Sequence, residues 1–371
     1  MPSLHHVGLF ESISDETMFH EKSGNPYICT MKYFWYILVA AAAVSCSGAG
    51  RNEVNGTEGT RYAEFFSIVD SSHVVTFSPF GASPDTIDIS VPAGSIVCMS
   101  TSYVAYLDAV GKDSVITGVS GLGYVSSPQL TGRDDVYDIG YDAELDYERI
   151  VSLKPDYVVA YSVSSVEPQY VAKLRSLGIR LIMANDHLES HPLARAEYIR
   201  FFGALTGCLD KADSVFHEIE ANYIGIMESA DTSCRQKVLF NIPYSDQWFI
   251  PGGQNYMARL VSDAGGETLG AEEGARESSV ISIEQAYLLA KKADVWLNPG
   301  WCRTKSQLLS VNPVFSSFGI DRVYNNILRT NDKGGNDFWE SGAARPDLIL
   351  EDLVRIFSGE RGSFNYYVEV Q

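Results

Sequence analysis

The stretch that decides the fold runs from Glu148 to Val159 and reads Glu-Arg-Ile-Val-Ser-Leu-Lys-Pro-Asp-Tyr-Val-Val. It predicts a short helix that ends before Asp156 and is followed at once by a buried strand. A second stretch, from Glu284 to Val295, reads Glu-Gln-Ala-Tyr-Leu-Leu-Ala-Lys-Lys-Ala-Asp-Val and keeps this order, with two extra residues between its Glu and its Asp. The approximate repeat indicates two halves of similar build.

Strands and helices alternate on both sides of the first stretch. Residues 95–99 are typical of a strand, and Ser100-Thr101-Ser102 is typical of the N-cap of a helix that ends at Gly111. Further strands are expected at 114–119, 157–161 and 179–184, with a helix over 169–177. Because strands that alternate with helices pair in parallel, we expect a mainly parallel sheet covered on both faces.

A long helical stretch leads to a second set of strands. Its second part, Asp210 to Ser229, is long enough to cross between two lobes. Strands are expected again at 237–242 and 294–297, with helices at 256–264 and 345–357. The predicted fold is α/β: two Rossmann-like lobes with mainly parallel central sheets, joined by a single long helix. The expected boundaries are 61–208 for the N-terminal lobe, 209–230 for the helix and 231–371 for the C-terminal lobe.

The composition argues against one large class of partners. The chain has 371 residues, and its 28 Lys and Arg stand against 47 Asp and Glu, which gives a formal net charge of −19. Binding to nucleic acid depends on clustered basic side chains, which are absent from this sequence. No nucleic acid is therefore expected as a partner.

The segment from Met31 to Cys46 is typical of an export signal. It has a basic start at Lys32, an apolar run over 33–44 and small residues before the cysteine. The run is too short for a membrane span, which needs about 20 residues, and suits the hydrophobic part of a signal peptide. Val44-Ser45-Cys46 resembles a bacterial lipobox, so we expect Cys46 to carry lipid and to become the first mature residue.

The segments on either side of this signal support the interpretation. Residues 1–30 lack its features and are interpreted as an upstream extension. Residues 47–60 are rich in Gly, Thr, Asn and Glu without an apolar period, which predicts a flexible tether. The alternative for 31–46 is a buried helix that happens to end at a cysteine.

Together these features resemble one known family. The chain is similar to periplasmic binding proteins of ABC importers for iron-siderophores, haem and cobalamin. The features that carry this resemblance are the lipobox, the Ser-Thr-Ser cap, the Glu148–Asp156 motif, the long helix and the second α/β lobe. The resemblance covers about residues 61–371. It implies a monomeric, non-enzymatic protein without a cofactor, held by lipid in the cell envelope on the periplasmic side of a membrane. It also implies that a ligand binds in a cleft between the lobes and passes to the permease membrane subunits.

The resemblance assigns a role to one glutamate in each half. Family members carry an exposed glutamate on each lobe that docks onto arginines of the permease, and Glu148 and Glu284 match these positions by motif. The alternative is an ordinary solvated glutamate at a helix start, which the helix dipole favours by about 0.3–1 kcal/mol.

Ligand-binding side chains are expected on loops that follow the carboxyl ends of strands. Aromatic rings there suit a flat macrocycle or a catecholate by stacking, and Tyr and Trp also offer a polar group. Each ring could instead cap the core of its sheet. The predicted set is Ser102, Tyr103, Tyr124 and Tyr161 in the first lobe and Tyr244, Trp248, Trp301 and Trp339 in the second.

Other kinds of site find little support in the sequence. The histidines show no spacing typical of a metal site, and no two of the six cysteines form a Cys-x-x-Cys pair, so no metal site is expected. Gly118-Val119-Ser120-Gly121 lacks the spacing of a nucleophile elbow. Two alternatives remain: a surface lipoprotein that scavenges ligand without a permease, and a secreted hydrolase.

Overall fold

A computed structural model describes residues 59–141, 144–245 and 247–371 of the chain. All described residues belong to one compact unit. The predicted upstream extension, the predicted signal peptide with the predicted lipid-anchor residue Cys46, and most of the predicted tether lie outside the described residues.

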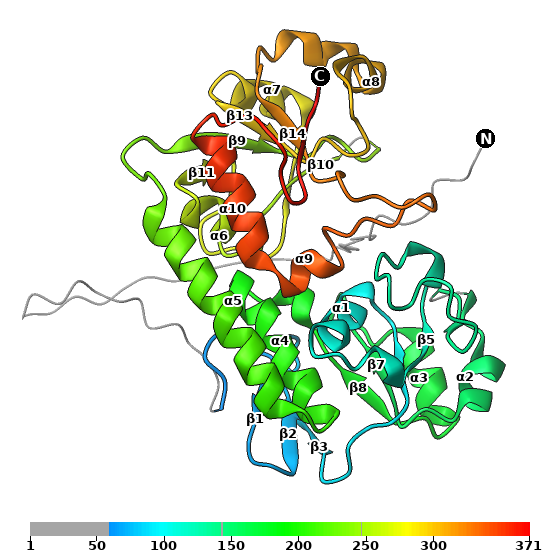
Figure 1. The fold of residues 1–371 in the computed structure, drawn as a ribbon. Helices are drawn as coiled ribbons and strands as arrows, with labels where there is room; N and C mark the ends of the chain where they lie inside the picture. The colour runs from blue at the N-terminus through cyan, green and yellow to red at the C-terminus, as the bar shows by residue number, and fades with distance from the viewer. Residues whose placement is uncertain (1–58, 142–143, 246) are drawn as a thin grey trace, which may run out of the picture. The chain divides into compact units, whose positions relative to one another are not determined.

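The first half of the described chain is built around a parallel sheet with the strand order β6-β5-β4-β7-β8 (Figure 1). Val97 pairs with Val158 in the centre of this sheet, and both are buried. Apolar residues on both faces are what a parallel sheet covered by helices requires. The predicted parallel sheet is therefore confirmed, with strands β4 (Ile96–Cys98), β5 (Ile116–Val119), β6 (Tyr137–Asp138), β7 (Tyr157–Ala160) and β8 (Leu181–Met183).

Helices follow these strands as the alternation predicts. Ser100 is the N-cap of α1, and its side chain accepts a hydrogen bond from the backbone N–H of Ser102. A separate antiparallel sheet precedes the parallel one, with strands β1 (Phe66–Ile68), β2 (His73–Thr76) and β3 (Asp85–Asp88). The helices of this half are α1 (Thr101–Ala109), α2 (Tyr147–Leu153), α3 (Gln169–Ser176) and α4 (Pro192–Leu205), with short 3-10 turns η1 (Asp113–Val115), η2 (Leu122–Tyr124) and η4 (Asp186–Leu188).

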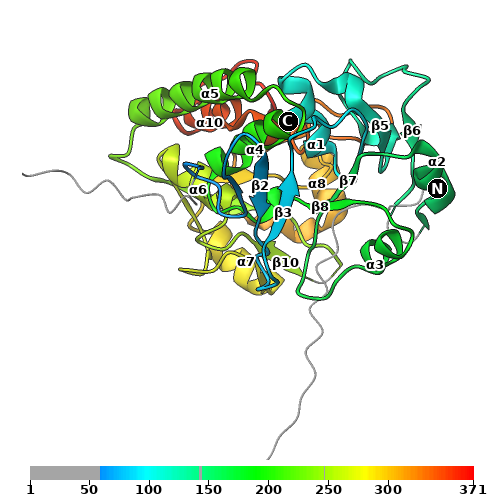
Figure 2. The ribbon, with the colours of Figure 1, turned by 90° about the horizontal axis from the view of Figure 1, so that it is seen from below.

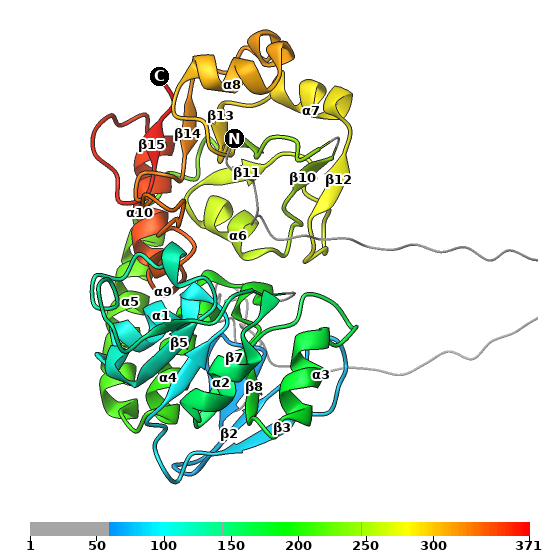
Figure 3. The same ribbon diagram turned by 90° about the vertical axis from the view of Figure 1, so that its right-hand side faces the viewer.

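A second sheet repeats the architecture, with the order β11-β9-β13-β14-β15. Its strands are parallel except for β15, which pairs antiparallel with β14. The strands are β9 (Gln236–Phe240), β11 (Gly266–Thr268), β13 (Val295–Leu297), β14 (Val323–Asn325) and β15 (Val368–Glu369), and β10 (Trp248–Ile250) pairs antiparallel with β12 (Ser279–Ile281). The helices are α6 (Tyr256–Asp263), α7 (Ile283–Ala290), α8 (Lys305–Val311), η5 (Pro313–Ser317), α9 (Ser341–Ala344) and α10 (Pro346–Phe357). Figure 3 shows α7 and α8 beside this sheet and α2 and α3 beside the first one.

The long helix α5 (Leu209–Ser229) leads from the first sheet to the second along the chain. At 1.5 Å per residue its 21 residues extend about 31 Å, which matches the predicted joining helix. One face is buried through Ala212, Phe216 and Tyr223. The helix packs along α4 and α10, and Figure 2 shows α10 beside it.

One hydrophobic cluster extends through both halves. It takes in Val104, Phe202 and Phe216 from the first half and α5, together with Leu350 and Tyr367 near the C-terminus. The opposite face of each sheet has a cluster of its own. Shared packing of this kind couples the two sheets mechanically. No helix within residues 59–371, masked positions aside, has the length and apolar character to span a bilayer.

Candidate functional site

The predicted residues of the first lobe follow the carboxyl ends of β4, β5 and β7 along the chain. Ser102 is buried, and its Oγ lies 2.9 Å from Ser100 Oγ. Tyr103 is fully buried, and its hydroxyl donates to the carbonyl oxygens of Ala160 and Ala184. This corrects the prediction for Tyr103, because the ring faces the sheet and Phe202 from the first turn of α1 and is covered in this structure.

Tyr124 and Tyr161 are the two predicted residues of this lobe that keep some exposure. Tyr124 lies in η2 with its ring centroid 5.9 Å from that of Tyr141. Tyr161 follows β7 and meets His187 edge to face at 5.5 Å. The Nε2 atom of His187 is buried without a hydrogen-bond partner among the described residues, and burial lowers the pKa of this imidazole. Tyr124 and Tyr161 are therefore the predicted aromatic residues of the first lobe that a ligand could reach.

The second lobe presents three of its four predicted aromatic residues to solvent. Tyr244 follows β9 and is 55% exposed, Trp301 follows β13 and is 54% exposed, and Trp339 precedes α9 and is 45% exposed. Exposed rings of this size offer apolar area together with a polar N–H or O–H group.

Trp248 is the exception in this lobe. It is fully buried as the first residue of β10 and stacks on Trp296 at 6.0 Å and on Phe318 at 6.0 Å. Its indole Nε1 donates to Phe240 O at 2.7 Å. The prediction that Trp248 contacts a ligand is thus corrected: the side chain belongs to the core of the lobe.

Three asparagines lie in a row at the carboxyl edge of the second sheet, and the set of site residues predicted from the sequence did not include them. Phe240, Leu297 and Tyr324 are register partners on β9, β13 and β14, and each is followed by an asparagine. Two of these, Asn241 and Asn298, have φ values of 64° and 58°, a left-handed conformation that asparagine tolerates better than most residues. A sequence signal existed, since three apolar runs end in Phe-Asn, Leu-Asn and Tyr-Asn.

The third member of the row, Asn325, holds the loop that carries Trp301. Its Nδ2 donates to Gly300 O at 2.9 Å and to Cys302 O at 2.8 Å, so that both neighbours of Trp301 are fixed. Asn325 is itself fully buried. A buried amide with both hydrogens used in this way gives an exposed ring a defined position.

The segment 326–340, which follows β14, reaches the first lobe. Asn331 Nδ2 donates to Gly123 O at 3.2 Å and to Val125 O at 3.1 Å. Glu340 accepts backbone N–H groups from Ser126 at 2.7 Å and from Ser127 at 2.8 Å. Burial raises the pKa of Glu340 to about 7, although both N–H bonds act in the other direction. This segment therefore fixes the Tyr124 loop from the opposite lobe.

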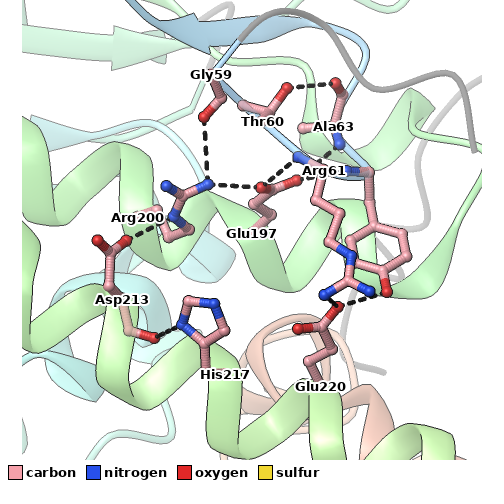
Figure 4. Close-up of polar contacts among 10 residues, drawn as sticks. Gly59, Thr60, Arg61, Ala63, Glu197, Arg200, Asp213, His217 and Glu220 are labelled. Carbon is pink, nitrogen blue, oxygen red and sulfur yellow. Dashed lines mark hydrogen bonds and ion pairs between the residues drawn. The ribbon is translucent and has the colours of Figure 1, made fainter. Parts of the chain in front are cut away.

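The first described residues are held by buried carboxylates, as Figure 4 shows. Glu197 on α4 accepts the backbone N–H groups of Arg61, Tyr62 and Ala63, each at 2.8 Å, and also pairs with Arg200 at 2.8 Å. These contacts fix the segment just after the predicted tether to the body of the protein. They also satisfy backbone N–H groups that would otherwise lack an acceptor.

Further contacts extend this arrangement on both sides. Glu189 accepts the N–H groups of Glu64 and Phe65, with its nearest contact at 2.9 Å. Glu220 accepts the hydroxyl of Tyr62 at 2.5 Å. The Glu64 side chain reaches the second lobe through an ion pair with Arg276 at 2.6 Å.

Where α4 meets α6, α9 and α10, there is a small cavity of about 10 Å³, room for about one water molecule. Arg195 lines it, pairs with Asp186 at 3.1 Å and lies 4.4 Å from the ring centroid of Tyr256. The Arg195 Nε atom has no protein partner among the described residues. The cavity is too small for an organic ligand.

Glu148 and Glu284 occupy equivalent helix positions. Glu148 is the second residue of α2, after the N-cap Asp146, and Glu284 is the second residue of α7, after the N-cap Ser282. Both side chains are exposed. The two extra residues of the second stretch fall near and after the end of α7, so they leave the position of Glu284 unchanged.

The aspartates that close the two stretches also correspond. Asp156 accepts backbone N–H groups from Gly94 at 2.8 Å and Ser95 at 3.0 Å, just before β4. Asp294 accepts the N–H of Lys237 in β9 at 2.8 Å. Each aspartate ties the end of its helix–strand unit to the neighbouring strand, so the structure confirms the repeat seen in the sequence.

The part of the chain that the structure describes holds no group of three or more His, Cys, Asp or Glu side chains placed to bind a metal ion. Cys98 and Cys302 are free and buried, and burial raises the pKa of both thiols. Neither thiol is therefore activated as a nucleophile.

The chain is similar to known proteins in sequence and in fold. An uncharacterized lipoprotein of Methanocaldococcus jannaschii is 24% identical over 284 residues, which cover 73% of this chain and 67% of that protein. The vitamin B12 binding protein BtuF of Vibrio cholerae superposes with a TM-score of 0.54 at 14% identity, over 72% of this chain and 97% of its own. The heme-binding protein RhuT of Roseiflexus sp. RS-1 gives 0.52 at 20% identity, over 72% and 98%.

A heme-binding protein of Pseudomonas aeruginosa gives a TM-score of 0.55 at 17% identity, over 75% of this chain and 98% of its own. These likenesses agree with the two-sheet fold described above. The family model for periplasmic binding proteins matches residues 96–318, which is more than half of the chain. The chain therefore belongs to the periplasmic binding protein family.

Proposed function

We propose that the chain is the solute-binding component of an ABC importer and is not an enzyme. It captures an iron-siderophore, haem or cobalamin-type ligand between its two lobes and delivers it to a membrane permease. The similar proteins named above bind vitamin B12 or heme according to their names. A large, partly flat ligand of this kind is the proposed cargo.

The observation that carries the proposal is the set of exposed rings at one edge of the second sheet. Tyr244 and Trp301 follow adjacent parallel strands, and parallel strands end at the same edge. Trp339 comes from the segment that contacts the first lobe. Three large rings offer stacking area for a macrocycle or catecholate, while their N–H and O–H groups are available for its polar edge.

Two further parts of the proposal concern the cell envelope. Glu148 and Glu284 are proposed to dock onto basic side chains of the permease, because both are exposed at the starts of short helices. Cys46 is proposed to carry the lipid that holds the protein at the periplasmic side of a membrane. The relationship to a lipoprotein supports this part.

The test is direct identification of the ligand. The lipidated chain, purified from its own cells, is expected to carry a ligand that mass spectrometry identifies and that shows haem, corrin or ferric-siderophore absorbance. Titration of ligand-free protein with haemin, cyanocobalamin and ferrichrome, followed by tryptophan fluorescence, then gives the Kd. Absence of a co-purified ligand together with failure to bind all three probes would contradict the proposal.

A matched set of variants locates the site. Trp301→Ala is expected to weaken binding about 10-fold or more, because a stacking ring contributes on the order of 1 kcal/mol beyond its buried area. Val69→Ala removes an exposed apolar side chain from the turn after β1 and serves as the control. If both variants bind the probe with equal affinity, the exposed rings of Tyr244, Trp301 and Trp339, here called the aromatic edge, are not part of the ligand site.

A further inference from the structure

Each helix that carries a proposed docking glutamate also exposes one aliphatic side chain. On α2, Val151 is 42% exposed and lies three residues after Glu148. On α7, Leu288 is 62% exposed and lies four residues after Glu284. Residues three and four apart on a helix are neighbours on one face, with Cβ atoms about 5–6 Å apart. Both lobes therefore place an apolar group next to the glutamate.

Packing fixes the rotation of both helices. Ile150 and Ala286 each come two residues after the glutamate, and both are fully buried. Ile150 belongs to the cluster on the outer face of the first sheet and Ala286 to the corresponding cluster of the second. Because these buried residues hold the helices in place, the glutamate and the aliphatic side chain on the other side stay in solvent.

A glutamate with an exposed aliphatic residue on the same helix face thus occurs in both lobes, and this is unusual for the described part of the chain. A single exposed aliphatic residue is normal on any protein surface. Among the described α-helices, however, large exposed hydrophobic residues lie within the bounds of only α2, α7 and α8. Two of these three helices are the ones that present Glu148 and Glu284.

We propose that each docking point is a glutamate–aliphatic pair, Glu148 with Val151 and Glu284 with Leu288, that a permease receives with a basic side chain set in an apolar surface. The inference rests on the proposed transport function. It adds a contact that excludes water from the ion pair. An ion pair shielded in this way is stronger than one that stays in solvent, where exposed pairs contribute little.

The two glutamate–aliphatic pairs are expected to contribute unequally to docking. Leu288 is larger and more exposed than Val151, so it loses more solvent contact when covered. Its removal therefore has the larger effect. Leu288→Ser is expected to raise the protein concentration needed for half-maximal uptake about 10-fold, and Val151→Ser about 3-fold, from the apolar area each buries.

The experiment measures uptake in the native cells with the full-length, lipidated chain. The probe is whichever of haemin, cyanocobalamin or ferrichrome the purified protein binds. Leu309→Ser on α8 and Leu177→Ser at the end of α3 are the matched controls, because both residues are exposed leucines that lie on neither α2 nor α7. All four variants are expected to keep the thermal stability and probe affinity of the unmodified chain.

The outcomes separate this inference from the function on which it rests. Reduced uptake in Val151→Ser and Leu288→Ser, with the control variants unaffected, supports the pairs. Normal uptake in both, while charge reversal of Glu148 and Glu284 stops uptake, overturns the aliphatic contribution and leaves glutamate docking in place. Uptake that survives all of these changes overturns docking through α2 and α7, whereas a chain that carries no co-purified ligand and binds none of the three probes overturns the transport function itself.

Discussion

Gly335 lies so close to the backbone of Tyr124 that a Cβ atom at position 335 would overlap the Tyr124 carbonyl oxygen. The contact joins segment 326–340, which follows β14 of the second sheet, to the loop after β5 of the first. On either side of it, Asn331 and Glu340 bind backbone groups of the same loop. The position of Tyr124, a predicted ligand-binding residue, therefore depends on a glycine more than 200 residues further along the chain.

Replacing this glycine tests that dependence. Gly335→Ala is expected to lower the free energy of unfolding by about 1–3 kcal/mol, because the backbone of one segment must shift to relieve the overlap. Urea denaturation gives this value, and probe titration shows whether the Tyr124 loop affects affinity. Gly225→Ala on α5 is the control, since an added Cβ there has no atom within 4 Å. An unchanged unfolding midpoint in Gly335→Ala would show that the two segments separate freely.

Asn325 offers a second test, of the loop that carries Trp301. Asn325→Ala leaves the carbonyl oxygens of Gly300 and Cys302 without their donor, at an expected cost of about 2–3 kcal/mol in stability. The freed loop should also alter the fluorescence of Trp301. The same substitution in a Trp301→Phe background identifies that signal, since the fluorescence change should vanish there. A change of equal size in both backgrounds would contradict the assignment.

The segment after the tether can be tested through a protease site. Glu197→Gln removes the charge that accepts three backbone N–H groups and pairs with Arg200, which should cost about 3 kcal/mol. Trypsin should then cleave after Arg61 far faster than in the unmodified chain. Glu218→Gln, an exposed neighbour on α5, is expected to cleave at the original rate. Equal protection of both variants would mean that other contacts hold the segment.

Glu340 predicts a pH dependence of stability. Burial raises its pKa from 4.5 to about 7, helped by the nearby carboxylates of Asp337 and Asp108 and opposed by the N–H groups of Ser126 and Ser127. The folded state therefore holds a proton between pH 4.5 and 7 that the unfolded state has lost. Stability from this group is present below pH 4.5 and is lost as the pH rises through 7.

The measurement is the free energy of unfolding from pH 5 to pH 8. The unmodified chain should lose stability over this range, by up to about 3 kcal/mol from Glu340 alone. Glu340→Gln should show a flatter profile, because the amide does not titrate. The difference between the two profiles isolates Glu340 from the other acidic groups. Parallel profiles would contradict the raised pKa.

The arrangement of the elements was largely predictable from the sequence. Alternation of apolar strands with capped helices predicted strands within one or two residues of β4, β5, β7, β8, β9 and β13, and the helix over 210–229 became α5. The strand β10 and its partner β12 were missed because they pair across about 30 residues and neither shows a long apolar run. Such pairing is a tertiary effect that local pattern does not contain.

The same missed strand explains why the site was only partly predictable. Tyr244 and Trp301, which the strand-end rule selected as ligand-binding residues, are exposed, and their role stays a prediction. The rule wrongly included Trp248, which pairs with Ile281 and turns into the core. The prediction for Tyr103 was wrong for a related reason. The N-cap at Ser100 predicts where α1 begins, but it does not predict which way the first turn of α1 faces. Burial of a ring is decided by neighbours that are distant in sequence.

Charge reversal at the two helix starts tests the proposed delivery to a permease. Glu148→Lys and Glu284→Lys together should abolish uptake of the bound probe, because an attractive contact with a basic partner becomes repulsive in both lobes. Probe affinity should stay the same, since both side chains are exposed on α2 and α7 and neither belongs to the aromatic edge. Glu144→Lys, an exposed glutamate just before α2, is the control and should leave uptake intact. Because exposed ion pairs weaken with salt, uptake by the unmodified chain should also fall as ionic strength rises. Unchanged uptake in the double variant would contradict docking of the permease through Glu148 and Glu284.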